Sequence, residues 1–251
     1  MVETRPEGST TRICAAKDPR GLVIFDCDGV VVDSEPLAVA ALAEFLQGIG
    51  LPVGEAYVYR AFLGRSWPAV QARLQADYGL RLSEVEVAAY RDFLLERFRA
   101  CVQAMPGVVE AVAALDRPCC VASSSTPERL ELALDKAGLK ERFSPHIFSA
   151  ALVRRGKPAP DLFLHAAQAM GVAPRDCLVI EDSPAGIEAG LAAGMTVAAF
   201  LGGSHVGPGQ LRAAAERLVP PILFEKMSEL PSVLAAFDAR RAQAVGRSAP
   251  P

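Results

Sequence analysis

The stretch LVIFDCDGVVVDSE at residues 22–35 determines how the rest of the chain must fold. Its first four residues are apolar, which is typical of a strand buried on both faces of a parallel sheet. Two carboxylates, Asp26 and Asp28, follow at once, and Gly29 gives the chain a place to turn. Residues two apart in extended backbone point the same way, so we expect both carboxylates to face one site.

Outward from this stretch, apolar runs of strand length alternate with helical patterns. We expect further strands near residues 119–122, 146–150, 177–181, 195–200 and 221–224, with helices between them. This alternation predicts an α/β fold with a doubly wound parallel sheet, that is, a Rossmann-like core.

The segment directly after the first strand has a different pattern. Apolar residues recur at helical spacing near 36–50, 53–62, 67–78 and 83–102, and we find no strand signal among them. We therefore expect an inserted all-helical cap over residues 35–104. The predicted core comprises residues 21–34 and 105–238, preceded by a flexible arm at 1–20 and followed by a disordered tail at 239–251.

Composition excludes several kinds of partner. The net charge is −3 and the pI is about 5.7, whereas proteins that bind nucleic acids or anionic membranes usually carry a basic face. No apolar run reaches the length of about 18 residues that a membrane helix needs. We find neither a signal segment nor a zinc-like spacing among the six cysteines, so we expect a cytoplasmic protein with free thiols. We expect a monomer or a weak dimer.

Three more polar motifs follow predicted strands. They are Ser123 in VASSSTPERL, Glu181 and Asp182 in CLVIEDSPAG, and Lys157 in VRRGKPAPD, which precedes a helix. Taken alone, the first two also suit helix capping and the lysine also suits a solvated loop. In a parallel sheet, however, ligands bind outside the carboxyl ends of the strands, and the shared placement of these motifs favours a common site.

The motifs together resemble those of the haloacid dehalogenase superfamily. FDCDGVVVDSE is similar to its first motif, DxDG[VT], and the resemblance extends over roughly residues 20–225 by the spacing of the later motifs. It implies phosphoryl transfer in which Asp26 is the nucleophile and Asp28 the general acid and base. It also implies that Ser123 binds the phosphate and that Lys157 neutralises the negative charge.

Carboxylate oxygens in this arrangement suit Mg²⁺. We predict that Asp26, Asp182 and the backbone carbonyl of Asp28 hold the cation, and that Glu181 contributes through a water molecule. The backbone N–H groups of Ser124 and Ser125 lead toward a helix start, which favours an anion cradle beside Ser123.

The cap offers candidates for substrate recognition. Gly64, Arg65 and Trp67 lie between two predicted helices, and the resemblance implies that this loop reaches over the active site. Arg65 suits a second anionic or hydroxylated group of the substrate, and Trp67 suits a pocket wall, although either residue also suits cap structure. The three histidines show no metal-ligand spacing. We give them no catalytic function, although His205 follows a strand at the catalytic edge.

The expected function is a Mg²⁺-dependent phosphomonoesterase that acts on a small phosphorylated sugar, sugar acid or polyol through an aspartyl-phosphate. The flanking sequence looks like the β-phosphoglucomutase-like subgroup, in particular its phosphatases of the 6-phosphogluconate phosphatase kind. The alternative is a sugar phosphomutase of the β-phosphoglucomutase type. Such mutases usually carry a histidine where this chain has Ala38. Asp28 argues against a dehalogenase, and the complete motif set argues against a protein that keeps the fold without turnover.

Overall fold

The computed structural model describes residues 20–63, 67–207 and 211–247. Six parallel strands form one sheet in the order β3-β2-β1-β4-β5-β6. The strands are β1 (Leu22–Phe25), β2 (Cys119–Ser123), β3 (Ile147–Ser149), β4 (Cys177–Glu181), β5 (Thr196–Phe200) and β6 (Ile222–Phe224). The chain builds β1, β2 and β3 outward on one side and then crosses to β4 on the other. The strand order therefore reverses at β1, the position where doubly wound sheets bind ligands.

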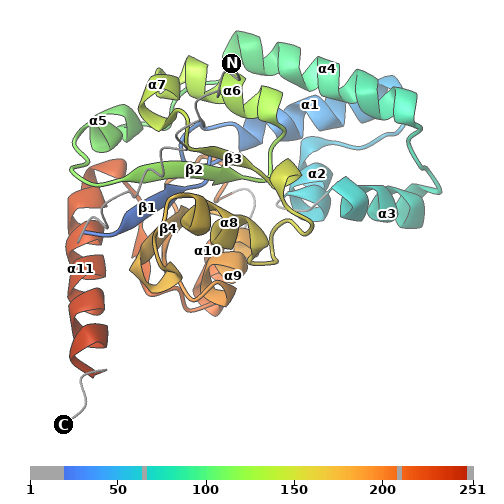
Figure 1. The fold of residues 1–251 in the computed structure, drawn as a ribbon. Coiled ribbons are helices and arrows are strands. Elements are labelled where there is room, and N and C mark those ends of the chain that lie inside the picture. The colour runs from blue at the N-terminus through green and yellow to red at the C-terminus, as the bar shows by residue number, and fades with distance from the viewer. Residues whose placement is uncertain (1–19, 64–66, 208–210, 248–251) are drawn as a thin grey trace, which may run out of the picture.

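Helices cover both faces of the sheet (Figure 1). The core helices are α5 (Val108–Ala113), α6 (Pro127–Lys136), α7 (Lys140–Phe143), α8 (Asp161–Ala169), α9 (Pro184–Ala192), α10 (Leu211–Arg217) and α11 (Leu230–Arg247), with the short 3-10 turns η1 (Ala150–Leu152), η2 (Pro174–Asp176) and η3 (Met227–Glu229). Successive side chains of β1 point to opposite faces of the sheet, so the hydrophobic core is divided between the two faces. Val23 and Phe25 pack with residues of α5, α6 and α11, whereas Leu22 and Ile24 pack with residues of α8 and α9. β1 is thus buried on both sides, as its apolar sequence predicts.

The cap is the helical insertion between β1 and α5. It consists of α1 (Glu35–Gly48), α2 (Glu55–Phe62), α3 (Trp67–Tyr78) and α4 (Glu84–Cys101). Figure 1 places these helices beyond the carboxyl ends of β1 and β2. Helix α4 begins with a capping box in which Ser83 and Glu86 satisfy each other's backbone N–H groups.

The two linkers between core and cap run side by side. Val32 and Ala104 form an antiparallel bridge. The backbone N–H of Met105 donates to the carbonyl of Val31 at 2.8 Å, and that of Asp33 donates to Gln103 at 3.1 Å. The insertion therefore leaves and rejoins the core at one place. The precise limits of the cap, residues 35 and 104, stay our prediction.

The expected disordered tail is wrong for residues 239–247, because α11 continues to Arg247. Tertiary contacts explain the helix. The guanidinium of Arg117 forms a two-point salt bridge with Asp238 at 2.9 and 3.0 Å, and Arg241 pairs with Asp176 at 2.9 Å while lying over the ring of Phe237. Local composition did not reveal these contacts. The predicted arm lies outside the described residues except for Arg20.

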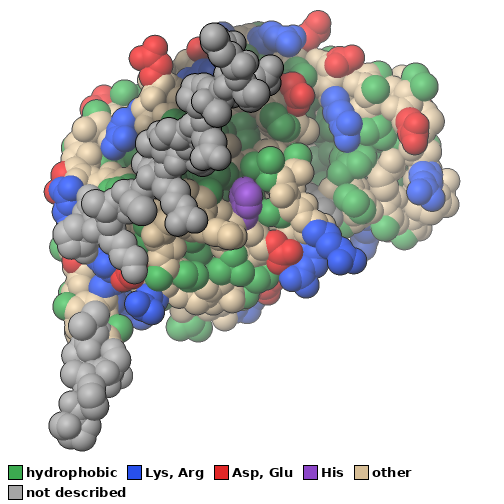
Figure 2. Space-filling view, in the orientation of Figure 1, with side chains coloured by type: hydrophobic (Ala, Val, Ile, Leu, Met, Phe, Trp, Pro, Cys, Tyr) green, Lys and Arg blue, Asp and Glu red, His purple; other side chains and the backbone are tan. Residues whose placement is uncertain are grey.

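Charged side chains of both signs are spread over the described part of the face in Figure 2. Among the described helices, none has both the length and the apolar character that crossing a bilayer would require. Cys27, Cys119, Cys120 and Cys177 are buried free thiols, and Cys27 packs in the apolar core as its position between two aspartates predicts.

Candidate active site

Three neighbouring strands deliver the predicted residues to one edge of the sheet. Asp26 directly follows β1, Ser123 is the last residue of β2, and Glu181 is the last residue of β4. β1 pairs with β2 on one side and with β4 on the other, and the N–H of Asp26 donates to the carbonyl of Ile180 at 2.9 Å. Because the strands are parallel, residues that follow them must meet at this edge.

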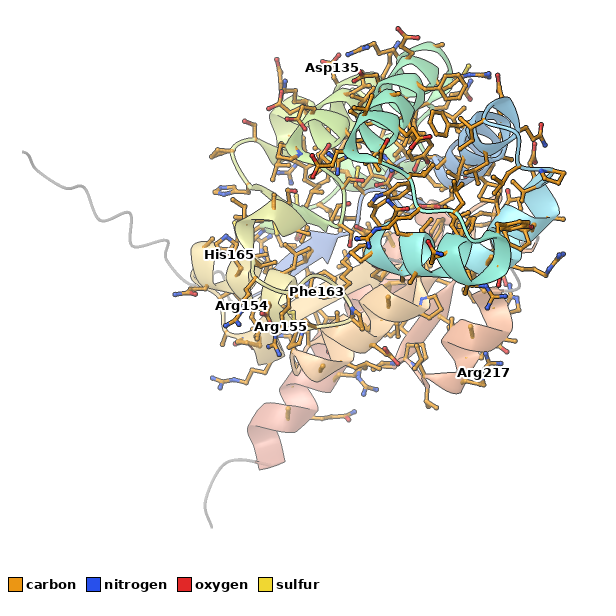
Figure 3. All side chains as sticks on the ribbon, turned by 90° about the vertical axis from the view of Figure 1, so that its right-hand side faces the viewer. Asp135, Arg154, Arg155, Phe163, His165 and Arg217 are labelled. Carbon is orange, nitrogen blue, oxygen red and sulfur yellow. The ribbon has the colours of Figure 1, made fainter. Side chains whose placement is uncertain are left out.

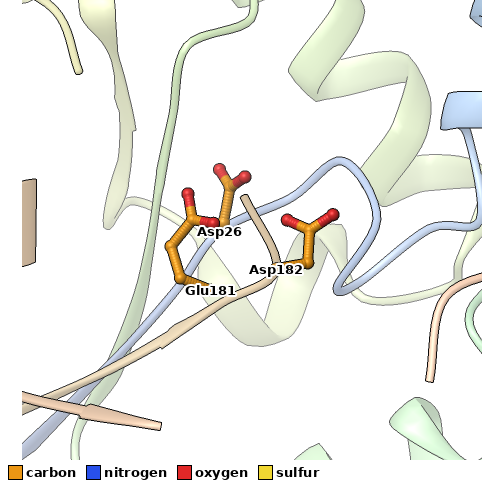
Figure 4. Close-up of side chains that lie close together, drawn as sticks. All are labelled: Asp26, Glu181 and Asp182. Carbon is orange, nitrogen blue, oxygen red and sulfur yellow. The ribbon is translucent and has the colours of Figure 1, made fainter. Parts of the chain in front are cut away.

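Asp26, Glu181 and Asp182 form a buried acidic cluster (Figure 4). One ligand atom from each side chain lies within 4.8 Å of the others. All three donors are oxygens, which hard divalent cations such as Mg²⁺ prefer. A buried cluster of three carboxylates whose donors are all hard oxygens fits a bound divalent cation.

Lys157 supplies positive charge to this cluster. It lies in the loop before α8, and its Nζ is 2.9 Å from Asp26 Oδ1 and 2.8 Å from Glu181 Oε1. The ring of Phe163 lies beneath the ammonium group, 4.8 Å from Nζ to the centroid. Burial lowers the pKa of Lys157, but the two carboxylates outweigh it and raise the pKa above its ordinary value. The lysine is therefore charged and fixed in place.

Lys157 does not fully offset the burial of the two carboxylates that it contacts, Asp26 and Glu181. Burial raises the pKa of Asp26 to about 7, opposed by Lys157 and aided by the charges of Glu181 and Asp28. Burial likewise raises the pKa of Glu181 despite Lys157. Burial thus disfavours the ionised form of Asp26, which is the form that acts as a nucleophile. A divalent cation would supply the missing charge.

Asp28 points to a different set of partners. Its Oδ1 accepts hydrogen bonds from Ser34 Oγ and Arg129 Nη2, each at 2.6 Å, and its Oδ2 accepts one from Ser125 Oγ. Burial raises the pKa of Asp28, but Arg129 and the two hydroxyl groups outweigh it, so the pKa lies below its usual value. The structure thus holds Asp28 ionised, and its carboxylate is not part of the acidic cluster.

Sequence reasoning missed the residues that hold Asp28. Arg129 lies in the first turn of α6, and its guanidinium covers the ring of Phe98 in cap helix α4 at 4.3 Å. Ser34 lies in the linker to the cap. The sequence position of Arg129 could have indicated its function. Side chains in the first turn of a helix lean toward the helix start, and the start of α6 adjoins the loop that contains Ser123.

The loop after β2 differs in one detail from the predicted anion cradle. Ser123 is buried, and its Oγ accepts a hydrogen bond from the N–H of Ser125 at 3.1 Å. That N–H group is consequently already used, which corrects our expectation that it is free for phosphate. Ser124 is exposed. The functions of Ser123 and Ser124 in phosphate binding stay predictions.

The cap candidates have a mixed outcome. Gly64 and Arg65 lie outside the described residues. Trp67 stacks on Tyr90 of α4 at 5.4 Å between ring centroids, so the described contact is with the cap itself. Two arginines outside the cap, Arg154 and Arg155, lie close to Lys157 in sequence. Both are exposed near the start of α8 (Figure 3), and Arg155 pairs with Asp161.

Two further titratable groups lie near the cluster. His205, in the loop after β5, is fully buried with its Nε2 2.7 Å from Asp182 Oδ2. Burial lowers the pKa of His205, but Asp182 more than compensates and raises it. Glu35, the first residue of α1, has a pKa raised to about 7 by burial and by the charge of Asp28, against the effect of Arg129.

The sequence is similar to those of known phosphatases. The 6-phosphogluconate phosphatase of Escherichia coli strain K12 is 30% identical over 187 residues, which cover 74% of this chain and 85% of that protein. The fructose-1-phosphate phosphatase of the same strain is 35% identical over 179 residues, covering 69% and 92%.

The fold is shared with solved structures as well. A HAD family hydrolase from Deinococcus radiodurans, crystallised with bound phosphate and sodium, is 33% identical with a TM-score of 0.71, and the match covers 86% of this chain and 96% of that one. The family model of haloacid dehalogenase-like hydrolases matches residues 21–194, from the first strand to the end of α9 and the turn after it. This chain belongs to the haloacid dehalogenase-like hydrolases.

Proposed function

We propose that this phosphatase is a Mg²⁺-dependent phosphomonoesterase that acts through an aspartyl-phosphate on a small phosphorylated sugar, sugar acid or polyol. The observation that carries the proposal is the position of Lys157. Its ammonium group lies within 2.9 Å of both Asp26 and Glu181, so three segments that are distant in sequence meet around one carboxylate.

Asp26 is the proposed nucleophile. Its carboxylate attacks the phosphorus atom while the bond from phosphorus to the leaving oxygen breaks, and this gives an aspartyl-phosphate. Asp28 donates a proton to the leaving oxygen and then takes one from the water that attacks the intermediate. That second attack releases inorganic phosphate and regenerates Asp26. Because the structure holds Asp28 ionised, Asp28 must first leave Ser34, Ser125 and Arg129 and take up a proton from water before it can act as the acid.

Asp26 and Asp182 are the side chains that would hold Mg²⁺, together with the backbone carbonyl of Asp28, and Glu181 would contribute through water. The cation would neutralise the negative charge of the phosphoryl group and of these carboxylates. Lys157 keeps its own contacts to Asp26 and Glu181 and adds a point charge beside the phosphate. Ser123 would hold a phosphate oxygen through its hydroxyl group.

The substrate class rests on the relatives. The names of the two E. coli phosphatases specify a phosphorylated sugar acid and a phosphorylated ketose. We extend this class, not either compound, to the present chain.

A phosphate-release assay tests the proposal. The purified protein is incubated with a panel of hexose, sugar-acid and polyol phosphates, with Mg²⁺ or with EDTA. We expect phosphate release from at least one member, loss of release with EDTA and recovery with excess Mg²⁺. No release from any member, or release that EDTA does not affect, would contradict the proposal.

Variants separate the chemistry from the fold. Asp26→Asn should abolish release and also the acid-stable ³²P label that wild-type protein retains after quenching. Asp135→Asn is the matched control, because Asp135 is an exposed carboxylate on α6 (Figure 3). Incubation with β-glucose 1-phosphate tests the mutase alternative, which predicts glucose 6-phosphate instead of inorganic phosphate.

A further inference from the structure

His205 is a buried polar side chain that the proposed chemistry does not use. Its exposed fraction is 0%, and its Nδ1 has no hydrogen-bond partner among the described residues. Among the described residues, it forms one ion pair, which joins Nε2 to Asp182 Oδ2 at 2.7 Å. Buried polar groups are normally satisfied, so a histidine in this position calls for an explanation.

Two glycines make room for the contact between His205 and Asp182. A Cβ atom on Gly29 would lie 2.0 Å from Asp182 Oδ2 and 2.9 Å from His205 Cε1, and one on Gly203 would lie 2.4 Å from His205 Cε1. Gly29 also has φ +76°, but Gly203 does not have a positive φ, so space alone accounts for its lack of a side chain. The DxDG turn and the loop after β5 thus enclose the imidazole and the carboxylate.

The contact occupies one particular oxygen of Asp182. Oδ2 lies against the imidazole and against the backbone of Gly29, while the side chain as a whole belongs to the acidic cluster with Asp26 and Glu181. A carboxylate that is held on one oxygen can present the other in a fixed direction. Groups that hold a ligand side chain in this way often matter almost as much for affinity as the ligand itself.

We propose that His205 is a positioning residue for the cation site: it holds Asp182 by Oδ2 and so presents Oδ1 to the divalent cation. This inference rests on the proposed function, because it assumes that Asp182 is a cation ligand. It adds a residue from a fifth chain segment, the loop between β5 and α10, to those that shape the site.

Titration of the purified protein with Mg²⁺ by isothermal calorimetry tests the inference without any substrate. His205→Leu fills the space but removes the polar contact, and we expect it to weaken Mg²⁺ binding by about 10–100-fold. His205→Gln places an amide nitrogen at a similar reach and should recover at least part of this loss. The Mg²⁺ concentration for half-maximal phosphate release should rise in parallel, with kcat restored at saturating Mg²⁺.

Ser204→Ala is the matched control. Ser204 is the exposed neighbour of His205 and donates its hydroxyl to Asp33 at 2.9 Å, not to Asp182, so its loss should leave Mg²⁺ affinity unchanged. If His205→Leu does not fold, Gly203→Ala replaces it, because the added Cβ must displace the imidazole.

Unchanged affinity in His205→Leu or Gly203→Ala, or equal losses in the leucine and glutamine variants, would overturn the inference. A wild-type protein that binds Mg²⁺ but releases no phosphate would instead refute the proposed function, and the calorimetric comparison would still decide the role of His205.

Discussion

Replacing Lys157 with methionine tests whether the charge balance of the cluster is understood. The lysine side chain is 4% exposed and contacts Asp26, which is 10% exposed, and Glu181, which is fully buried. Methionine keeps most of the volume but leaves two buried carboxylates without their cation. Breaking a buried ion pair by removing one partner costs roughly 3–5 kcal/mol.

This free energy converts into a thermal shift. For a chain of this size, each kcal/mol changes Tm by roughly 2–4 °C, so we expect Lys157→Met to lower Tm by roughly 6–20 °C. Mg²⁺ should reduce this decrease in Tm, because it binds the folded acidic cluster and adds positive charge there. A ligand at 100 times its Kd stabilises the folded state by about 2.7 kcal/mol. The variant should therefore gain more from Mg²⁺ than the wild type gains.

The decrease in Tm caused by Lys157→Met should also depend on pH. Without Lys157, the pKa of Asp26 must rise above its present value of about 7, since Lys157 lowers it. A carboxyl whose pKa is raised in the folded state is stabilising when protonated, and that contribution disappears as pH rises through the folded pKa. The Tm difference between the variant and the wild type should consequently be larger at about pH 8 than at about pH 6.

Differential scanning calorimetry with and without Mg²⁺ measures these shifts. Lys140→Met is the matched control, because Lys140 is 44% exposed and pairs with Glu131 at 3.2 Å. Such a surface pair contributes about 0–1 kcal/mol. A Tm change in Lys157→Met as small as that in Lys140→Met, or a loss that neither Mg²⁺ nor pH alters, would refute the reasoning.

Three further predictions concern neighbouring groups. Asp26→Asn should gain stability relative to the wild type between pH 3.8 and about 7 in the absence of divalent cations, because the raised pKa of Asp26 destabilises the wild type as pH rises; urea titrations at several pH values measure the difference. Asp28→Asn should slow formation of the aspartyl-phosphate from sugar phosphates by about 10²–10⁴-fold in a single turnover, but its formation from p-nitrophenyl phosphate far less, because nitrophenolate leaves without a proton; equal losses in this first step would contradict acid catalysis. Gly186→Ala should destabilise by about 1–3 kcal/mol in urea, because its Cβ would lie 1.7 Å from Glu181 Oε1, whereas Gly48→Ala in α1, with no atom within 4 Å, should not destabilise.

The sequence predicted the core well because the signals there are local. An apolar strand followed by DxDG specifies a buried strand and a turn, and each later strand carries its own run of β-branched and apolar residues. The convergence of Asp26, Lys157 and Asp182 could be predicted because parallel strands place their carboxyl ends together.

Contacts between distant segments could not be predicted in the same way. The partners of Asp28 come from a linker, a loop and a helix, and only the folded chain brings Ser34, Ser125 and Arg129 to one carboxylate. His205 has no ligand spacing, so its proximity to Asp182 depends on the path of a loop. In the helix through residues 239–247, Arg241 pairs with Asp176, which lies more than 60 residues earlier in the sequence.

The adjacent linkers have a consequence for how such chains can vary. The backbones of Val31 and Met105 are hydrogen-bonded at 2.8 Å, so the two ends of the inserted segment are adjacent. The sheet therefore needs no rearrangement to carry an insertion of another length. Insertions of different length, or a short reverse turn, would meet the same two attachment points. The inserted module can therefore be exchanged while the strand order and the acidic cluster stay as they are.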